Sequence, residues 1–218
     1  MPLDTLRDHI QKTYALLRIG IALIGILFPI VVLVGGLLVS IEPQGSISAY
    51  YHTPMGDIFV GSLCAIGAFL YLYKGVTNSE NIALNFAGIF IILVALLPTV
   101  APESLECETF TAPYLHGISA ILFFIAIAYV CIFEASSTLE AVQDPGRRRL
   151  YDFAYKGLGA GMIILPLASA LLLYLLGQTS LVVYVVEVAA VWVFGIYWIV
   201  KTLEINETQI DRKAFEEK

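Results

Sequence analysis

Charged residues are scarce in this chain, and their scarcity excludes whole classes of protein. Asp, Glu, Lys and Arg make up 14% of the 218 residues, whereas 59% are hydrophobic. A soluble globular domain carries about 25% charged residues, so this chain has too little polar surface for a water-exposed protein. Its 12 Lys and Arg residues are outnumbered by 18 Asp and Glu, which leaves no basic surface for nucleic acid. The composition excludes a soluble enzyme, a disordered chain and a nucleic-acid-binding protein.

The chain also has few cysteines, and it lacks the common catalytic sequence motifs. Cys64 and Cys131 fall inside apolar runs, which leaves Cys107 alone in a polar loop. An extracytoplasmic disulfide needs two cysteines outside the membrane, so no disulfide framework is expected. The chain contains no HExxH, GxSxG or HxxxH pattern. Any site must therefore be assembled from dispersed residues.

Long hydrophobic runs, by contrast, are abundant. About 20 apolar residues cross the roughly 30 Å hydrocarbon core of a bilayer, and lipid cannot satisfy free backbone groups, so each run should be a helix. The sequence predicts an all-α, polytopic six-helix transmembrane bundle that forms a single transmembrane domain over residues 1–218. The expected spans are about 16–39, 57–73, 82–100, 114–133, 153–176 and 180–203.

The basic residues predict the orientation of these spans. All twelve Lys and Arg lie at or beyond the same ends of the spans: around the start of the first, after the second, between the fourth and the start of the fifth, or from the end of the sixth to the C-terminus. Basic residues near span ends stay in the cytoplasm, so both termini are expected there and the loops after spans one, three and five outside. The twelve acidic residues on the cytoplasmic side balance this charge, which places the whole net charge of -6 on the outer side. In a bacterium this would be an inner-membrane protein.

Small residues predict which helix faces pack together, because close backbone approach drives association in lipid. Gly157 and Gly161 form a GxxxG pair in the fifth span. In the second span a stripe of small residues begins at Asp57 and continues through Gly61 and Ala68. We expect both features to face neighbouring helices.

The candidate functional residues gather at the outer end of the bundle. The first outer loop, residues 41–57, is the densest polar segment and holds Ser48, His52 and Asp57. His116 opens the fourth span at the same face, and Glu187 lies about seven residues into the sixth. A carboxylate in lipid is costly, so Glu187 should point into the bundle, as a functional group or as a hydrogen-bond partner of a neighbouring helix. Asp57 fits a site or a helix cap equally well.

These residues allow two kinds of chemistry. His52, Asp57 and His116 could hold a divalent metal that activates water. Alternatively, Ser48 with a histidine and an acid could act by nucleophilic catalysis. The spacing leaves both possibilities open.

Two resemblances bear on the function. The arrangement Ser48-x-x-x-His52 followed by an acid resembles the alkaline ceramidase and adiponectin-receptor-like membrane hydrolases. That resemblance implies a serine, an aspartate and zinc-binding histidines, although those proteins have seven spans and paired histidines in the last one. The six spans, the segment Leu97-Pro98-Thr99 and the segment His116-Gly117-Ile118-Ser119-Ala120 are similar to the Frag/DRAM/Sfk-like group and its bacterial relatives. That similarity implies a role in lipid handling or remodelling.

The leading prediction is an integral membrane protein whose outward-facing polar pocket binds or processes a lipid headgroup. If it is an enzyme, it is a lipid hydrolase or a lipid-remodelling enzyme lined by Ser48, His52, Asp57, His116 and Glu187. One alternative is a small cation channel or transporter, which would require a homo-oligomer and place Glu187 along the path. Another is a noncatalytic scaffold or regulator whose segment Arg147–Arg149 meets anionic lipid or a partner, although three arginines are also an ordinary topology determinant.

Overall fold

The computed structural model describes residues 3–99, 112–176 and 181–208. These residues are helical, with no strand among them, which confirms the predicted all-α class. The chain follows the order α1 (Leu3–Leu38), a 3-10 turn η1 (Ser48–His52), α2 (Gly56–Leu72), α3 (Asn78–Leu96), α4 (Pro113–Tyr129), a π turn η2 (Val130–Glu134), α5 (Ser136–Leu139), α6 (Pro145–Leu176) and α7 (Leu181–Thr208).

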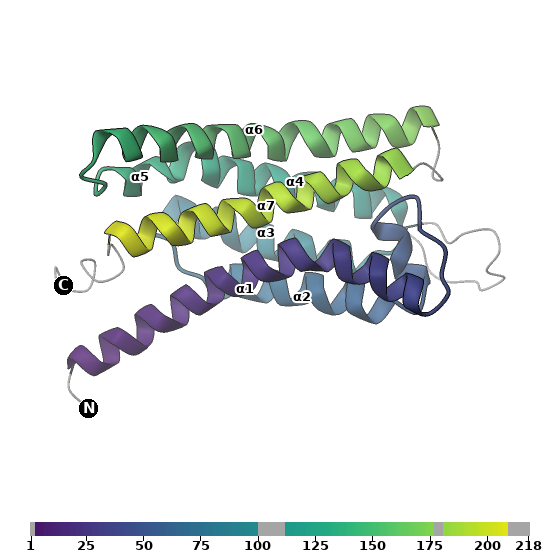
Figure 1. The fold of residues 1–218 in the computed structure, drawn as a ribbon, viewed down its shortest axis with the longest axis horizontal. Helices are drawn as coiled ribbons and strands as arrows, with labels where there is room; N and C mark the ends of the chain where they lie inside the picture. Colours follow the sequence, from purple (N-terminus) through teal and green to yellow (C-terminus); the bar gives the residue numbers. More distant parts are fainter. Residues whose placement is uncertain (1–2, 100–111, 177–180, 209–218) are drawn as a thin grey trace.

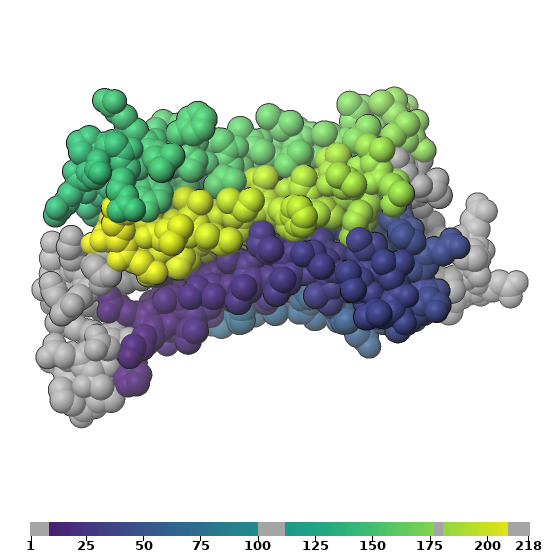
Figure 2. Space-filling view, viewed as in Figure 1, coloured from purple at the N-terminus to yellow at the C-terminus, as the bar shows by residue number. Residues whose placement is uncertain are grey.

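The long helices run side by side and pack as a closed ring (Figure 1). Around the ring α1 contacts α2, α2 contacts α3, α3 contacts α4, α4 contacts α6, α6 contacts α7, and α7 returns to α1. The space-filling view shows α7 seated between α1 and α6 on one face (Figure 2). Helix α1 begins and α7 ends at the same end of the ring, which we call the terminal end, while η1 lies at the opposite, loop end.

Five of the six predicted spans are helices long and apolar enough to cross a membrane. The remaining predicted span, residues 57–73, corresponds to α2. This helix is apolar but has only 17 residues, which correspond to a length of about 25 Å at 1.5 Å per residue. Large apolar side chains such as Leu23, Phe86 and Leu171 are exposed on the outside of the ring, as expected for helices that face lipid. That α2 also crosses the membrane, and that the termini are cytoplasmic, stay predictions.

Several helices continue beyond the predicted spans at the terminal end. Helix α6 begins at Pro145, not near residue 153, and α7 continues past residue 203 to Thr208. The fourth span continues through η2 into α5 and ends at Leu139. Hydropathy marks only the apolar part of a helix, whereas the extensions of the fourth span and of α7 bury the polar side chains Thr138, Glu204 and Thr208. The added start of α6 is mostly exposed.

Local sequence signals place the helix ends that border the loop end and the terminal end. The hydroxyl of Thr77 accepts a hydrogen bond from the Glu80 backbone N–H and caps α3, a role for which threonine is favoured. Helix α4 begins with Pro113 in its first turn, where proline's missing N–H costs nothing. This start places His116 in the first turn of α4, beside the end of α3.

The close approach of α2 and α3 depends on small residues outside the stripe predicted in the second span. A Cβ on Gly67 would lie 2.8 Å from the Gly88 carbonyl oxygen, and one on Gly88 would lie 2.7 Å from the Gly67 carbonyl oxygen. Gly61, in the predicted stripe, is exposed with nothing within 4 Å of its Cβ position. The predicted GxxxG pair is half right, because Gly157 is open, whereas a Cβ on Gly161 would lie 3.3 Å from the Val193 side chain of α7. Between them, Gly159 packs against Ile132. Small-residue spacing alone does not specify which helix face is buried.

We expect Gly67→Ala to destabilise the bundle by about 1–3 kcal/mol, because the added methyl group would force α2 and α3 apart. Gly61→Ala makes the same chemical change in the same helix without a clash, so it should leave stability unchanged or raise it slightly. Thermal unfolding of the two variants in detergent measures the difference. Equal melting temperatures would contradict the assigned α2–α3 contact.

Candidate functional site at the loop end

The loop between α1 and α2 packs into the loop end of the ring. Ser40, with φ of 61°, adopts a left-handed conformation after α1, and the Ile41 N–H bonds the Gly36 carbonyl at 2.9 Å, which turns the chain back. Ile47 and Tyr50 are buried, and the Tyr50 ring lies 6.2 Å from that of Tyr184 in α7. The loop therefore fills this end of the bundle and holds its polar groups against the helices.

Ser48 and His116 form a hydrogen-bonded pair at this end. Ser48 is the first residue of η1, and its Oγ lies 3.1 Å from Nε2 of His116 in α4. The other ring nitrogen, Nδ1, lies 2.8 Å from the carbonyl oxygen of Leu97 at the end of α3. A carbonyl only accepts, so Nδ1 carries the ring proton. In the neutral imidazole Nε2 is then the acceptor and the Ser48 hydroxyl is the donor.

This arrangement has the three parts of an activated nucleophile. A hydroxyl faces a base, and the base is oriented by a third group that fixes its tautomer. Here a backbone carbonyl, that of Leu97, occupies the place that sequence reasoning gave to an acid. His116 is only 6% exposed, while Ser48 is half-buried. Ser48 and His116 are therefore the two predicted site residues that the structure joins directly.

Glu187 points toward the bundle, as predicted, and anchors the loop. One carboxylate oxygen accepts the Ile47 backbone N–H at 2.7 Å. The other lies 3.4 Å from the Ser169 hydroxyl of α6. Ile47 and Ser48 are adjacent, so Glu187 and His116 hold consecutive loop residues against α7 and α4. Glu187 thereby positions the serine without contacting it.

We expect Glu187→Ala to loosen the loop, because it removes the carboxylate that accepts the Ile47 N–H. A hydrogen bond to a charged group contributes about 1.5–3 kcal/mol, so exchange of the Ile47 amide should accelerate roughly 10- to 100-fold. Glu187→Gln keeps an acceptor oxygen and should exchange nearly as slowly as the unmodified protein. Hydrogen–deuterium exchange with mass spectrometry over residues 41–55 measures this. Unchanged exchange in Glu187→Ala would show that the carboxylate does not hold the loop.

His52 and Asp57 do not join this pair. His52 ends η1, and its Nε2 lies 2.9 Å from the carbonyl oxygen of Thr99. Asp57 is exposed in the first turn of α2. Among the described residues no three His, Cys, Asp or Glu side chains are placed to hold a metal ion. His52, Asp57 and His116, the predicted metal ligands, therefore do not form a ligand set in this structure.

A second polar cluster, which sequence reasoning missed, lies inside the terminal end. Lys201 and Glu204 of α7 are 1% and 0% exposed and form an ion pair at 3.1 Å. The Lys201 ammonium also donates to Thr138 of α5 at 2.7 Å. The Tyr155 hydroxyl of α6 donates to the same Glu204 oxygen. We call these four residues the Lys201 cluster.

Further buried polar residues surround the Lys201 cluster and involve the remaining helices. Arg18 of α1 is buried, with a guanidinium nitrogen 3.5 Å from the Tyr73 hydroxyl. Glu80 of α3 is buried and accepts the Val76 N–H at 2.7 Å. Glu134 of η2 accepts from Tyr129 at 2.9 Å. The prediction of orientation assumed that the Arg18 and Lys201 side chains face water on the cytoplasmic side. In the structure both side chains are buried inside the ring. The signal that could have found the cluster is Lys201 and Glu204 at i,i+3 directly after an apolar run.

Comparisons with known proteins give no match, whether against family models, curated proteins or solved structures. The resemblances drawn from short motifs stay predictions, and the function rests on the geometry of the site.

Proposed function

We propose that this protein is an integral membrane hydrolase that cleaves an ester bond in the headgroup region of a membrane lipid. Ser48 is the nucleophile and His116 the general base. The observation that carries the proposal is the 3.1 Å contact between Ser48 Oγ and His116 Nε2, with Nδ1 held by the Leu97 carbonyl. The pair stands where sequence reasoning placed a lipid-processing site, but it uses no metal ligand set.

The chemistry follows from the hydrogen-bond directions. His116 Nε2 takes the Ser48 proton as Oγ attacks the ester carbonyl. The protonated imidazole then gives that proton to the departing alcohol, and an acyl group remains on Ser48. Water, deprotonated by the same nitrogen, attacks the acyl group, and Oγ recovers a proton as the acid leaves. The Leu97 carbonyl accepts from Nδ1 throughout and stabilises the imidazolium that forms twice per cycle.

The position of the pair suits a lipid substrate. Leu115 and Ile118 flank His116 on α4 and are exposed, so apolar surface borders the base. Ser48 lies in a polar loop where the apolar helices end, which is the level of lipid headgroups and ester bonds if the helices span the bilayer. With the orientation predicted from the basic residues, this is the outer leaflet of a cytoplasmic membrane.

The experiment is a hydrolysis assay with the purified protein in vesicles of defined ester lipids. The unmodified protein should release fatty acid and the deacylated lipid, and Ser48→Ala should release neither above background. Ser46→Ala, two residues earlier in the same loop, is the matched control. It removes a hydroxyl that accepts the Ala49 N–H at 3.1 Å but is not hydrogen-bonded to His116, and the variant should retain most of the activity. Full activity in Ser48→Ala, or no hydrolysis of any ester lipid by folded protein, would overturn the proposal.

A further inference from the structure

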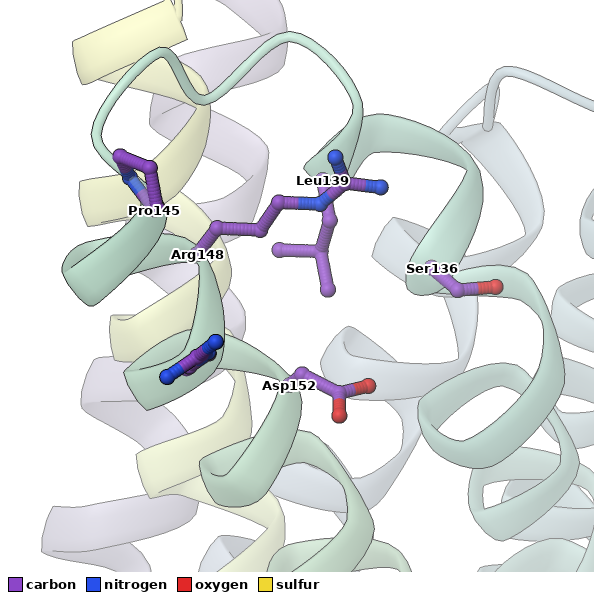
Figure 3. Close-up of a pocket in the computed structure, with 6 residues that line it drawn as sticks. Ser136, Leu139, Pro145, Arg148 and Asp152 are labelled. Atoms are coloured by element: carbon purple, nitrogen blue, oxygen red, sulfur yellow. The ribbon is translucent and has the colours of Figure 1, made fainter.

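A hollow of about 380 Å³ opens at the terminal end, where α5 meets the start of α6. It is lined by Ser136, Leu139, Pro145, Arg148, Arg149 and Asp152. In the close-up, the Arg148 side chain reaches from α6 toward Leu139 and Ser136, across the hollow from Asp152 (Figure 3). Its walls thus combine guanidinium donors with apolar carbon, while the Ser136 hydroxyl donates to the Phe133 carbonyl at 2.9 Å.

Some of the charged side chains around this hollow form ion pairs, and others do not. Arg147 pairs with Glu207 at 2.9 Å, and Lys156 pairs with Asp152 at 2.7 Å. Within the part of the chain that the structure describes, neither Arg148 nor Arg149 has an acidic side chain within ion-pair distance. The carboxylate in the wall is therefore matched by a lysine, while two arginines remain to attract an anion. Planar guanidinium forks match the oxygen geometry of phosphate.

On one face of α6 an exposed apolar side chain follows the basic turn beside the hollow. Phe153 follows Arg149 by four residues, so it lies on the same helix face one turn further along. Phe153 is 77% exposed and Leu150 is 65% exposed. A basic turn followed by an exposed apolar turn is the pattern of a helix that crosses the membrane surface.

We propose that this hollow binds the headgroup phosphate of an anionic phospholipid. Arg148 and Arg149 donate to the phosphate oxygens, and the acyl chains lie along Leu150 and Phe153. Two arginines and Lys156 against Asp152 leave the site with a net positive charge, which selects anionic over zwitterionic lipids. The site lies at the opposite end from Ser48 and does not depend on the proposed hydrolase function.

The test measures retention of phosphatidylglycerol by the full-length protein in detergent, with native mass spectrometry and phosphatidylcholine as the competing lipid. Arg148→Gln and Arg149→Gln should each lower retention several-fold, and the double variant at least about tenfold. Arg147→Gln removes the same charge one residue away, but from an arginine already paired with Glu207, and should change retention less than about twofold. Melting temperatures in lipid-free detergent confirm that all variants fold.

Three results would overturn the proposal. Equal losses in Arg147→Gln and Arg148→Gln would mean that the protein attracts anionic lipid by general surface charge. Equal retention of phosphatidylcholine and phosphatidylglycerol would mean that the arginines do not select a headgroup. Displacement of the lipid by sn-glycerol 3-phosphate at equal concentration would mean that the hollow is a site for a soluble phosphate.

Discussion

Replacing Lys201 by methionine is expected to destabilise the bundle by about 3–5 kcal/mol, because Glu204 would be left as an uncompensated buried charge. Glu204 is fully buried, and one of its two carboxylate oxygens already lacks a hydrogen-bond partner. The other oxygen would keep only the Tyr155 hydroxyl. Thermal unfolding in detergent should show a melting temperature lowered by roughly 6–20 °C.

The control for this prediction is Lys156→Met. Lys156 also pairs with an acid on its own helix, Asp152, but its side chain is exposed, and exposed pairs contribute little. The double variant Lys201→Met/Glu204→Gln removes both charges and should recover much of the lost stability, since replacing a whole buried pair is far cheaper than breaking it. Equal melting temperatures for Lys201→Met and Lys156→Met would contradict the structural role of the Lys201 cluster.

Replacing His116 by alanine is expected to lower lipid hydrolysis by about 10²- to 10⁴-fold, the usual contribution of a positioned general base. The reason is that Ser48 would lose the only histidine to which it is hydrogen-bonded. Because His116 is buried, the melting temperature of the variant is measured alongside its turnover of vesicle lipid. Added imidazole should restore part of the activity if the ring acts as a base, and should restore none if the ring merely supports the fold.

His52→Ala is the matched control for His116→Ala. His52 also bonds a backbone carbonyl, that of Thr99, and lies in the same turn as Ser48. It makes no hydrogen bond to Ser48 among the described residues, and its removal should lower turnover only a few-fold through the loop. A larger loss in His52→Ala than in His116→Ala would reverse the assignment of the base.

Sequence reasoning predicted the class of fold well, because helix formation in an apolar run follows from chain chemistry alone. The runs near residues 16–39 and 180–203 had to be helices if they were to satisfy their backbone groups in lipid. The polar extension of α7 to Thr208 was missed, because its stability comes from burying polar residues such as Glu204, which accepts a hydrogen bond from Tyr155 of α6. This burial depends on tertiary packing between helices, which a hydropathy profile does not report.

The candidate site was predicted in part. Ser48, His116 and Glu187 could be assigned to one end of the bundle because topology places their segments there. Asp57 was grouped with them by proximity in sequence, yet its position on α2 leaves it exposed. The group that orients His116 is the backbone carbonyl of Leu97, and no residue type marks such a carbonyl. The pairing of Ser48 with His116, 68 residues apart, depends on how α3 ends beside α4.

The most direct test of an activated Ser48 is covalent labelling with a fluorophosphonate, which reacts with serines whose hydroxyl is activated by a base. The labelled protein is digested and the modified residue identified by mass spectrometry. We expect one adduct on Ser48 in the unmodified protein and none in folded His116→Ala. An unlabelled Ser48 in protein that hydrolyses lipid, or equal labelling of Ser48 with and without His116, would contradict the proposed function.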